Sequence, residues 1–490
     1  MATLQTSSDA PGSQGPSGDE AAIAQARQLF DGLRANRWKL AQSTAEDRLK
    51  RLERFRKVLL AHRERLAQAA FRDFRKAHAE FDLTELQPLL LELQHMREHL
   101  EEWLRPRAAS TPIPLLGTRA EVRFEARGVV LVLGAWNYPL QLAALPIVPA
   151  VASGNAVLVR PSEKAPESAE ALRAVIAEAF DPSEVACVTG GLAVADALLD
   201  LPFDHLFFTG SSPVGKKVWV KAAEHFASVT LELGGKSPAI VDETADFKAA
   251  AERFAWGKWV NAGQTCVAPD HVLVHTSKQA ALLDALRDAT QKMYGGTEDA
   301  RRQSPDFARM IDDAALRRVQ TLLERTVAQG ARVELGGQVA KEERYFPPTV
   351  VSGVAPDSPL MEEEIFGPVL PVLTFNTLDE ACELANRYGK PLALYVFSKK
   401  DQNVAQVLGR TTSGGAVVNN TLLHLGNMDL PFGGVGQSGQ GSYHGLAGIR
   451  AFSHERAVLF QGRPSTLRLL YPPYTGAKKR LLRWIERLFT

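Results

Sequence analysis

Cysteine is scarce in this chain of 490 residues, which has only Cys187, Cys266 and Cys382. Three cysteines cannot form a disulfide framework in a chain of this length, and the sequence has no CxxC pair. We therefore expect a reducing, cytoplasmic compartment. HExxH and Asp-rich spacings are missing as well, so we predict no metal site.

An excess of one charge is also missing. The chain has 57 basic and 56 acidic residues, and its formal net charge is +1. This balance gives no sign of a nucleic-acid partner. Hydrophobic residues make up 45% of the chain, which is ordinary for a globular protein, and the length predicts two or three domains.

The sequence lacks a secretory leader and a clean membrane-spanning run. Residues 1–19 have no apolar core and no basic leader, and their Ser, Gly and Pro content predicts a disordered lead-in. Residues 128–159 contain no Asp, Glu, Lys or Arg, but prolines and polar residues interrupt them. We interpret this stretch as a buried strand, a turn, a helix opened by Pro139 and a second buried strand.

The hydrophobic pattern divides the rest of the chain. Residues 20–106 have the three-and-four spacing of helices. From Arg127 onward short apolar runs alternate with helical segments, and a second such series follows Cys266. This alternation predicts an α/β fold with two domains, each a mostly parallel sheet covered by helices on both faces. Residues 111–128 contain prolines and partly alternate, which favours a hairpin that stands off the first domain.

The segment FFTGSSPVGKK, residues 207–217, has the layout of a strand, a glycine turn and a helix. Gly210, Ser211 and Gly215 either bring backbone N–H groups and a helix N-terminus against a phosphate or form an ordinary turn. Lys217 stands where the phosphate loop of nucleoside triphosphatases has Ser or Thr. The missing hydroxyl disfavours a nucleotidase of that kind.

Two residues with reactive side chains leave alternatives open. Glu232, between two leucines in LELGGKSPAIV, is either a solvent-facing strand residue or a carboxylate held in a cleft with a raised pKa, which suits a general base. Cys266 has Gly263, Gln264 and Thr265 as neighbours, and these cannot build an apolar pocket around its sulfur. This setting favours a nucleophile over a core residue.

The remaining candidates are less distinctive. Asn137 in AWNYP is either a helix N-cap or a donor to a developing oxyanion. Residues 362–372, EEEIFGPVLPV, are typical of a loop that leads into a strand. Cys187 lies in a short apolar run and Cys382 on a helix face, so we predict both in the core. A serine hydrolase is disfavoured because no convincing G-x-S-x-G elbow is present.

Taken together, seven segments resemble the aldehyde dehydrogenases in order and spacing: AWNYP, VRPSEKAP, FFTGSSPVG, LELGGKSP, NAGQTCVAPD, EEEIFGPV and LPFGGVGQSGQGSYHG. The match runs from about residue 20 to about residue 460, and VAPD with GSYHG resembles the class 3 branch of fatty, aromatic and coniferyl-type enzymes. The resemblance implies an α/β fold with two doubly wound domains, a Rossmann-like cofactor domain and a catalytic domain, plus a β-hairpin oligomerisation arm. The implied limits are 20–110 and 129–231 for the cofactor domain, 232–425 for the catalytic domain, 111–128 and 440–463 for the oligomerisation segments, and 464–490 for a tail.

The resemblance also implies NAD(P)-dependent oxidation of an aldehyde to its acid. Cys266 would attack the aldehyde carbon as a thiolate, and the thioester formed after hydride transfer would be hydrolysed by water that Glu232 activates. Asn137 and the backbone N–H of Cys266 would hold the oxyanion. A thiolate suits both steps, because it is a strong nucleophile and a good leaving group.

For the cofactor, the resemblance implies NAD, with NADP also accepted. Gly210, Ser211 and Gly215 would hold the pyrophosphate. Glu163 would bond the adenosine ribose, and Glu364 the nicotinamide ribose. Phe366 would pack against the nicotinamide, and Trp136 would lie beside the site. The family usually has Lys where this chain has Arg160, next to the adenosine ribose. Arg is planar and bulkier than Lys, so this departure leaves the nucleotide preference open.

Residues 464–490 end in a basic stretch whose apolar residues share one helical face: Leu481, Leu482, Ile485, Leu488 and Phe489. Such a helix can cover a substrate funnel, contact a second subunit or lie as a peripheral element on an anionic membrane. We favour docking on protein, because one short helix has little membrane affinity. The resemblance implies an apolar medium-chain, long-chain or aromatic aldehyde as substrate, and a homodimer built through residues 111–128 and the strand near 450–460.

Two rival functions share this fold. An aldehyde dehydrogenase that acylates coenzyme A does not need a water-activating glutamate. A catalytically silent binding protein would lack a nucleophile or a base. The presence of Cys266, Glu232 and Asn137 together disfavours both rivals.

Overall fold

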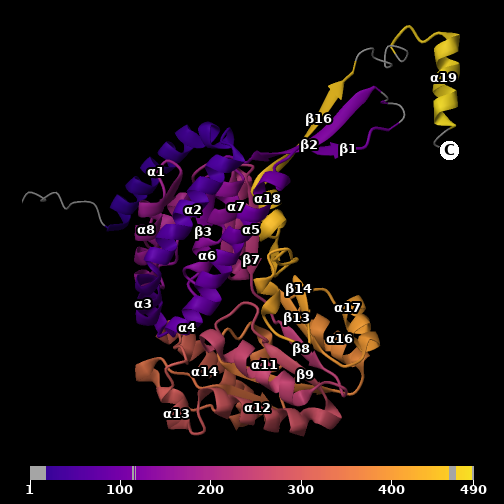
Figure 1. Cartoon of the computed structure of the whole chain (residues 1–490). Helices are drawn as coiled ribbons and strands as arrows, with labels where there is room; N and C mark the ends of the chain where they lie inside the picture. The colour runs from indigo at the N-terminus through magenta and orange to yellow at the C-terminus, as the bar shows by residue number, and fades with distance from the viewer. Residues whose placement is uncertain (1–17, 113–114, 116, 463–470, 488–490) are drawn as a thin grey trace, which may run out of the picture.

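The computed structural model describes residues 18–112, 115, 117–462 and 471–487. Figure 1 shows two α/β bodies, one above the other, and an arm of strands that extends from the upper body. The prediction of two α/β domains with a β arm is confirmed. Residues 1–17 of the predicted lead-in lie outside the described residues, whereas Gly18 and Asp19 belong to the first helix.

The first domain contains a six-stranded sheet in the order β15-β7-β6-β3-β4-β5. Neighbouring strands are parallel except β15 and β7. Every position of β3 and β4 is buried, as expected for strands covered on both faces. The chain runs from β3 outward to β5 and then returns to β6 on the other side of β3, so the switch point lies between β3 and β6. The strands are β3 (Val129–Leu133), β4 (Ala156–Arg160), β5 (Val185–Cys187), β6 (His205–Gly210), β7 (Ser228–Leu233) and β15 (Gly439–Gln440).

Side chains that alternate along β3 form two cores. Leu131 packs with α1, α9 and α10 on one face, and Val130 and Val132 pack with α2, α7 and α8 on the other. The helices of this domain are α1 (Gly18–Ala41), α2 (Ala45–Ala61), α3 (Arg63–Phe74), α4 (His78–Phe81), the π-helix η1 (Asp82–Leu86), α5 (Gln87–Trp103), α6 (Gln141–Ala144), α7 (Ile147–Ala152), α8 (Pro166–Ala179), α9 (Leu192–Leu199), α10 (Ser212–Glu224) and α18 (Gly445–Ala451).

The second domain contains a seven-stranded sheet in the order β10-β11-β12-β9-β8-β13-β14, parallel except for β10 and β11. Helices α14, α16 and α17 cover one face, and α11 and α12 cover the other. The strands are β8 (Pro238–Val241), β9 (His271–His275), β10 (Arg332–Leu335), β11 (Thr349–Ser352), β12 (Val369–Phe375), β13 (Ala393–Phe397) and β14 (Gly415–Val418). The helices are α11 (Phe247–Trp259), η3 (Val260–Gly263), η4 (Thr276–Lys278), α12 (Gln279–Tyr294), α13 (Glu298–Gln303), α14 (Asp313–Ala328), η5 (Lys341–Glu343), α15 (Pro359–Glu362), α16 (Leu378–Arg387), α17 (Asp401–Arg410) and η6 (Leu423–Gly426).

The arm is an antiparallel sheet of β1 (Arg107–Ala109), β2 (Thr118–Ala126) and β16 (Ser453–Gln461), in the order β1-β2-β16. The predicted hairpin is present, but its first strand precedes residue 111. Helix α19 (Gly476–Glu486) lies beyond the arm, away from both α/β domains (Figure 1). In the described ranges, no helix combines the length and apolar character needed to cross a bilayer.

The sheets divide the chain slightly differently from the predicted limits. Residue 232 lies in β7 of the first sheet, so the crossing to the second domain occurs between β7 and β8. Residues 439–451 return to the first domain as β15, paired with β7, and as α18, packed on α7. Only β16 of the predicted segment 440–463 belongs to the arm. The predicted strand, turn, helix and strand of residues 128–159 are present, with the helix split into α6 and α7 around Pro146.

Candidate active site

A cleft of about 1410 Å³ lies at the carboxyl ends of β3, β4 and β6, where the second domain faces the first. Open α/β sheets bind ligands at such a switch point, because the loops after the strands diverge there. Ten of the eleven predicted site residues line this cleft: Trp136, Asn137, Arg160, Glu163, Gly210, Ser211, Glu232, Cys266, Glu364 and Phe366. Residues of both domains therefore meet in one space.

Gly215 differs from the other ten, because it does not line the cleft. It lies one turn into α10, and a Cβ at this position would come within 2.6 Å of the Leu233 side chain. Its lack of a side chain allows α10 to pack closely on β7. Gly215 therefore helps to place the N-terminus of α10, and its role toward the cofactor stays a prediction.

The start of α10 lies at one end of the cleft. β6 ends at Gly210, α10 begins at Ser212, and the cleft is lined by Ser211, Ser212 and Val214. The first N–H groups of a helix have no intrahelical acceptor, and they carry the positive end of the helix dipole. A Cβ on Gly210 would approach the Phe208 ring to 2.5 Å, so glycine lets the backbone lie close to this ring at the end of β6. This arrangement fits the pyrophosphate of a dinucleotide.

Arg160 and Glu163 form an ion pair at the end of β4, with 2.7 Å between Nη2 and Oε2. The same Nη2 donates hydrogen bonds to the carbonyl oxygens of Gly190 (2.7 Å) and Gly191 (3.0 Å). The guanidinium therefore fixes the Glu163 carboxylate and the loop after β5. A carboxylate held here can accept hydrogen bonds from a ribose and repels a 2′-phosphate.

The turn that carries Cys266 has an unusual backbone. Asn261 and Ala262 have φ angles of 56° and 52°, and Gly263 has a φ of 73°. A Cβ on Gly263 would collide with the carbonyl of Gly367. Left-handed conformations in consecutive non-glycine residues are strained, so surrounding contacts have to hold this turn. The polar residues of NAGQT supply the hydrogen bonds that hold this backbone.

Burial raises the pKa of the Cys266 thiol well above its ordinary value, and the nearby carboxylates of Glu364 and Glu232 raise it further. Backbone N–H groups of Cys266 and Val267 oppose this shift. The free thiol is therefore protonated at neutral pH, and a base has to remove its proton before it can attack.

Glu232 lies near the end of β7 with only 3% of its surface exposed. Neither of its carboxylate oxygens has a hydrogen-bond partner among the described residues. Burial raises its pKa well above the ordinary value. A buried carboxylate that faces a cleft without a protein partner is suited to accept a proton from a thiol or a water.

Asn137 is held by the Cys266 turn. Its Nδ2 donates to the carbonyl of Gln264 (3.0 Å), and its own carbonyl accepts from Asn261 Nδ2 (2.8 Å). Tyr138 Oη and Thr265 Oγ1 lie 2.6 Å apart and join the same two segments. Sequence reasoning singled out Asn137 but not Asn261 or Tyr138. The motifs AWNYP and NAGQTC contain both residues, yet only the fold places these motifs in contact.

A second buried network supports the Glu364 loop. Lys236 Nζ forms an ion pair with Asp270 and donates to the carbonyls of Leu360 and Glu363, both at 2.8 Å. The second oxygen of Asp270 accepts from the N–H of Ile365 (2.8 Å). The segments GGKSP and VAPD therefore position the loop that bears Glu364 and Phe366. Trp136 faces Phe366 edge-to-face at 5.4 Å between ring centroids.

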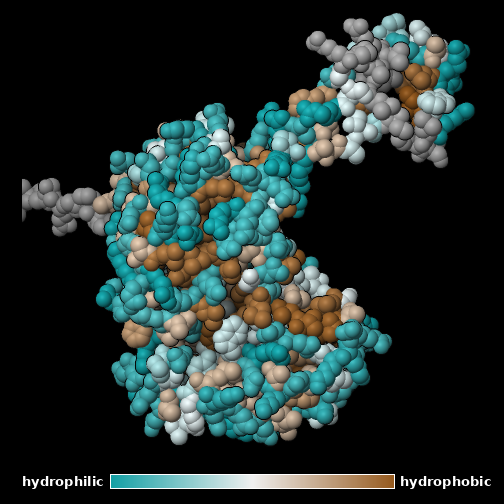
Figure 2. All heavy atoms as spheres, in the orientation of Figure 1, coloured by the Kyte–Doolittle hydropathy of each residue, from teal (hydrophilic) through white to brown (hydrophobic). Residues whose placement is uncertain are grey.

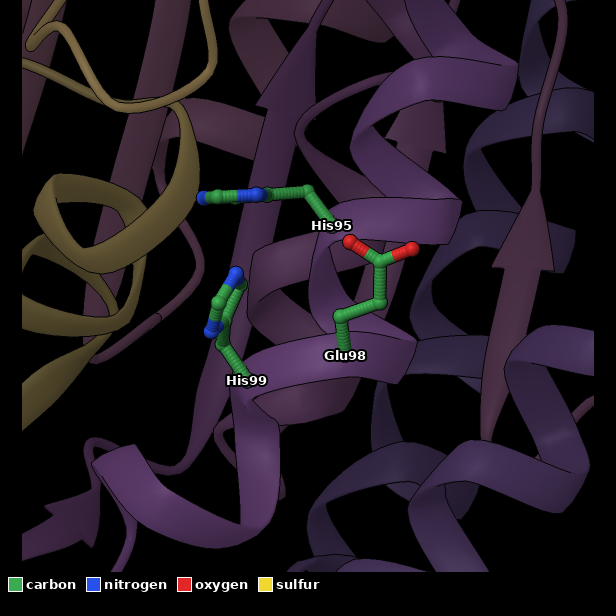
Figure 3. Close-up of side chains that lie close together, drawn as sticks. All are labelled: His95, Glu98 and His99. Atoms are coloured by element: carbon green, nitrogen blue, oxygen red, sulfur yellow. The ribbon is translucent and has the colours of Figure 1, made fainter.

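One cluster of potential metal ligands lies outside the cleft, on α5: His95, Glu98 and His99 (Figure 3). Their candidate ligand atoms lie within 4.8 Å of one another. Glu98 already accepts from Gln94 Nε2 (2.8 Å), and the His99 ring stacks on Trp103. These contacts account for the cluster without an ion, and the absence of a metal site stays a prediction.

Comparison with known proteins relates this site to one enzyme family. Residues 13–458 match the sequence model of the aldehyde dehydrogenase family. Aldehyde dehydrogenase family 3 member B1 of Rattus norvegicus is 40% identical over 458 residues, which cover 93% of this chain and 95% of that protein. The 4,4'-diaponeurosporen-aldehyde dehydrogenase of Staphylococcus aureus is 39% identical over 432 residues, 88% of this chain and 93% of that protein.

Solved structures show the same fold. The substrate-bound state of Staphylococcus aureus AldH has a TM-score of 0.89 and 37% identity, covering 95% of this chain and 99% of that chain. The NAD+ complex of a Bacillus cereus aldehyde dehydrogenase has a TM-score of 0.80 and 28% identity, covering 90% of this chain and 89% of that chain. An NADP-dependent enzyme of Escherichia coli has a TM-score of 0.82 and 25% identity, covering 90% of both chains.

Proposed function

Because this chain belongs to the aldehyde dehydrogenase family and is an NAD(P)-dependent aldehyde dehydrogenase, we propose that it oxidises apolar aldehydes to carboxylic acids through a thioester on Cys266. One observation carries the proposal: Cys266, Asn137 and the unpartnered Glu232 line the same cleft as the anion-binding start of α10. A nucleophile, an oxyanion donor, a base and a dinucleotide site together are what this reaction needs.

In the proposed first step, the Cys266 thiol releases its proton to solvent and Sγ bonds to the aldehyde carbon. The aldehyde oxygen becomes an oxyanion, which Asn137 and the N–H of Cys266 stabilise. Asn137 has two side-chain N–H groups, and only one is donated to Gln264. The second is therefore free to bind the oxyanion. A bound nicotinamide supplies the acceptor for the hydride that leaves this carbon.

The second step is hydrolysis of the thioester. Glu232 removes a proton from a water molecule, the water oxygen bonds to the thioester carbon, and the sulfur leaves. Because burial raises the pKa of Glu232, the carboxylate is a stronger base than an exposed glutamate. Coenzyme A transfer is the alternative fate of the thioester, and the buried Glu232 in the cleft favours water.

We infer an apolar aldehyde because the cleft wall around the reacting groups carries aromatic rings. Trp136 and Phe366 stand edge-to-face at the cleft, and both line it. The similar Staphylococcus aureus protein is named for a diaponeurosporen aldehyde, and we propose a large apolar aldehyde for this chain as well. Aromatic and long-chain aldehydes both fit this inference.

NAD is the proposed preferred cofactor, with NADP accepted less well. The carboxylate of Glu163, fixed by Arg160, disfavours a 2′-phosphate through like-charge repulsion. Arg160 itself is engaged by Glu163 and two backbone carbonyls, so its charge is only partly available to a phosphate.

A homodimer is the proposed assembly. β16 lies at one edge of the arm, and β14 lies at one edge of the second sheet. Leu408, Val418, Leu423 and Leu430 are exposed around β14, and Figure 2 shows hydrophobic side chains gathered in that region. Pairing of β16 with β14 of a second copy would cover both edges. Helix α19 would then reach the second copy, because it lies beyond the arm and away from both α/β domains of its own chain (Figure 1).

NADH formation at 340 nm with a panel of aldehydes, from acetaldehyde to long-chain and aromatic, tests the proposal. The panel is run for the wild type, Cys266→Ser and Cys382→Ser, since Cys382 is a buried cysteine of the same domain outside the cleft. We expect activity that increases with apolar size, is abolished by Cys266→Ser and is kept by Cys382→Ser. No activity with any aldehyde and either cofactor would contradict the proposed function and favour the binding-protein alternative.

A further inference from the structure

A buried ion pair of the N-terminal helices lies directly against the Asn137 segment. Lys76 follows α3, Glu85 lies in η1, and both side chains are 0% exposed. Lys76 Nζ and Glu85 Oε1 are 2.7 Å apart. The Lys76 ammonium also lies 4.0 Å from the centroid of the Tyr138 ring, a cation–π contact. Burying two charges is costly, so such a pair calls for an explanation beyond stability.

The pair holds both ends of the segment that bears the oxyanion donor. Lys76 Nζ donates to the carbonyl of Asn137 (3.4 Å). The second oxygen of Glu85 accepts from the N–H groups of Leu140 (2.8 Å) and Gln141 (3.4 Å), at the start of α6. The positions of Asn137 and of the helix that follows it are therefore fixed by one ion pair from another part of the chain.

A third charged residue connects the same region to the Cys266 turn. Glu80 Oε1 accepts from the backbone N–H of Asn261 (2.9 Å), which has the left-handed φ of 56°. Asn261 Nδ2 in turn donates to the carbonyls of Asn137 (2.8 Å) and Gln264 (3.0 Å). Asn137 and Gln264 are themselves joined at 3.0 Å. The oxyanion donor and the nucleophile turn thus form one hydrogen-bonded unit that Lys76, Glu85 and Glu80 hold from outside the cleft.

We propose that Lys76 and Glu85 are positioning residues that hold the Asn137 side chain in the orientation required by the oxyanion. This rests on the proposed function, because it assigns Asn137 that role. Neither Lys76 nor Glu85 lines the cleft, so each acts only through Asn137 and the start of α6. A donor displaced by even a fraction of an ångström stabilises the transition state less, while cofactor binding at α10 is unaffected.

A double-mutant cycle tests the proposal in the full-length enzyme. The variants are Lys76→Met, Asn137→Ala and the pair of both, with kcat, the KM for NAD+ and the Tm measured for each. Loss of an oxyanion donor lowers kcat by about 100- to 1000-fold, and we expect Lys76→Met to lower it by at least about 10-fold. The kcat of the double variant should lie within about threefold of the kcat of Asn137→Ala, because Lys76 no longer has an oxyanion donor to position. The KM for NAD+ should stay within about twofold in every variant.

Two further substitutions separate positioning from stability. Lys76→Arg restores a cation and should recover part of the lost kcat. Arg48→Met is the matched control: Arg48 is a buried cation that donates to the carbonyls of Ala41 and Ala152 and does not touch Asn137. It should lower the Tm as Lys76→Met does, but leave kcat within about twofold.

The positioning role would be overturned if the kcat loss of the double variant equalled the product of the two single losses. A wild-type kcat for Lys76→Met would overturn it as well. If Lys76→Met does not fold, the same cycle is run with Glu85→Gln in place of Lys76→Met. The amide oxygen of Gln at position 85 still accepts from the N–H of Leu140, so this variant keeps that contact. The outcome also distinguishes failure of the proposed function from failure of the positioning role. A wild-type kcat for Asn137→Ala itself would contradict the proposed function, whereas a slow Asn137→Ala beside a fast Lys76→Met contradicts only the positioning role.

Discussion

Replacement of Glu232 by Gln gives a sharp test of the two-step reaction. Glu232 is 3% exposed, and its oxygens have no partner among the described residues, so the amide breaks no hydrogen bond that the structure shows. Burial raises the pKa of Glu232 and so favours the neutral carboxyl, with which Gln is nearly isosteric. The Tm should therefore change by less than about 2 °C.

The effect on catalysis should be large and confined to hydrolysis. Loss of a general base costs about 100- to 10,000-fold, which corresponds to about 3 to 5.5 kcal/mol in the barrier. The steady-state rate should fall by this factor. Thioester formation releases NADH before hydrolysis, so the first turnover should still produce a burst of about one NADH per active site.

Stopped-flow absorbance at 340 nm measures burst and steady state in one trace. Cys266→Ser is the control and should show neither phase. A steady-state rate of Glu232→Gln above a tenth of the wild-type rate would refute the role of Glu232 in hydrolysis. Stimulation of the wild type by coenzyme A, with acyl-coenzyme A as product, would favour the acylating alternative.

Further predictions concern pH, the cofactor, the tail and metals. Burial raises the pKa of both Cys266 and Glu232, and their reactive forms are deprotonated, so kcat/KM should increase from pH 6 to pH 9; a flat profile would contradict this. Arg160→Lys loses hydrogen bonds that fix Glu163, so the kcat/KM ratio of NADP to NAD should rise by up to about tenfold; unchanged constants for both cofactors would disprove it. Deletion of residues 477–490 should reduce activity on long-chain aldehydes more than on short ones, and an equal loss would count against a role at the substrate entrance. Dialysis against EDTA should leave the rate unchanged, and a loss that zinc restores would reveal a metal site.

Local patterns were sufficient to predict the elements and the reacting groups. Runs such as GVVLVLG became buried strands, because apolar β-branched residues fit a sheet covered on both faces. Cys187 and Cys382 are buried as predicted, since their neighbours are apolar or share a helix face. Cys266 differed in its polar neighbours, and those neighbours now form the turn that exposes it to the cleft.

The support of the site could not be predicted in this way. Lys76 and Glu85 lie 61 and 55 residues from Asn137 and Leu140, the residues they hold, and a lysine and a glutamate within helical segments are ordinary surface residues by pattern. Their complete burial arises only when the N-terminal helices pack on the first domain.

Tertiary structure also decided which face of the fold each segment occupies. Gly215 lies against Leu233 and not in the cleft, because the packing of α10 on β7 turns it inward. The division between the domains follows strand pairing, which joins residues 439–440 to β7 from far along the chain. The sequence determines local conformation and chemistry because these depend on near neighbours. Long-range pairing and burial depend on the whole fold, and they decided how Asn137, Glu232 and Cys266 meet.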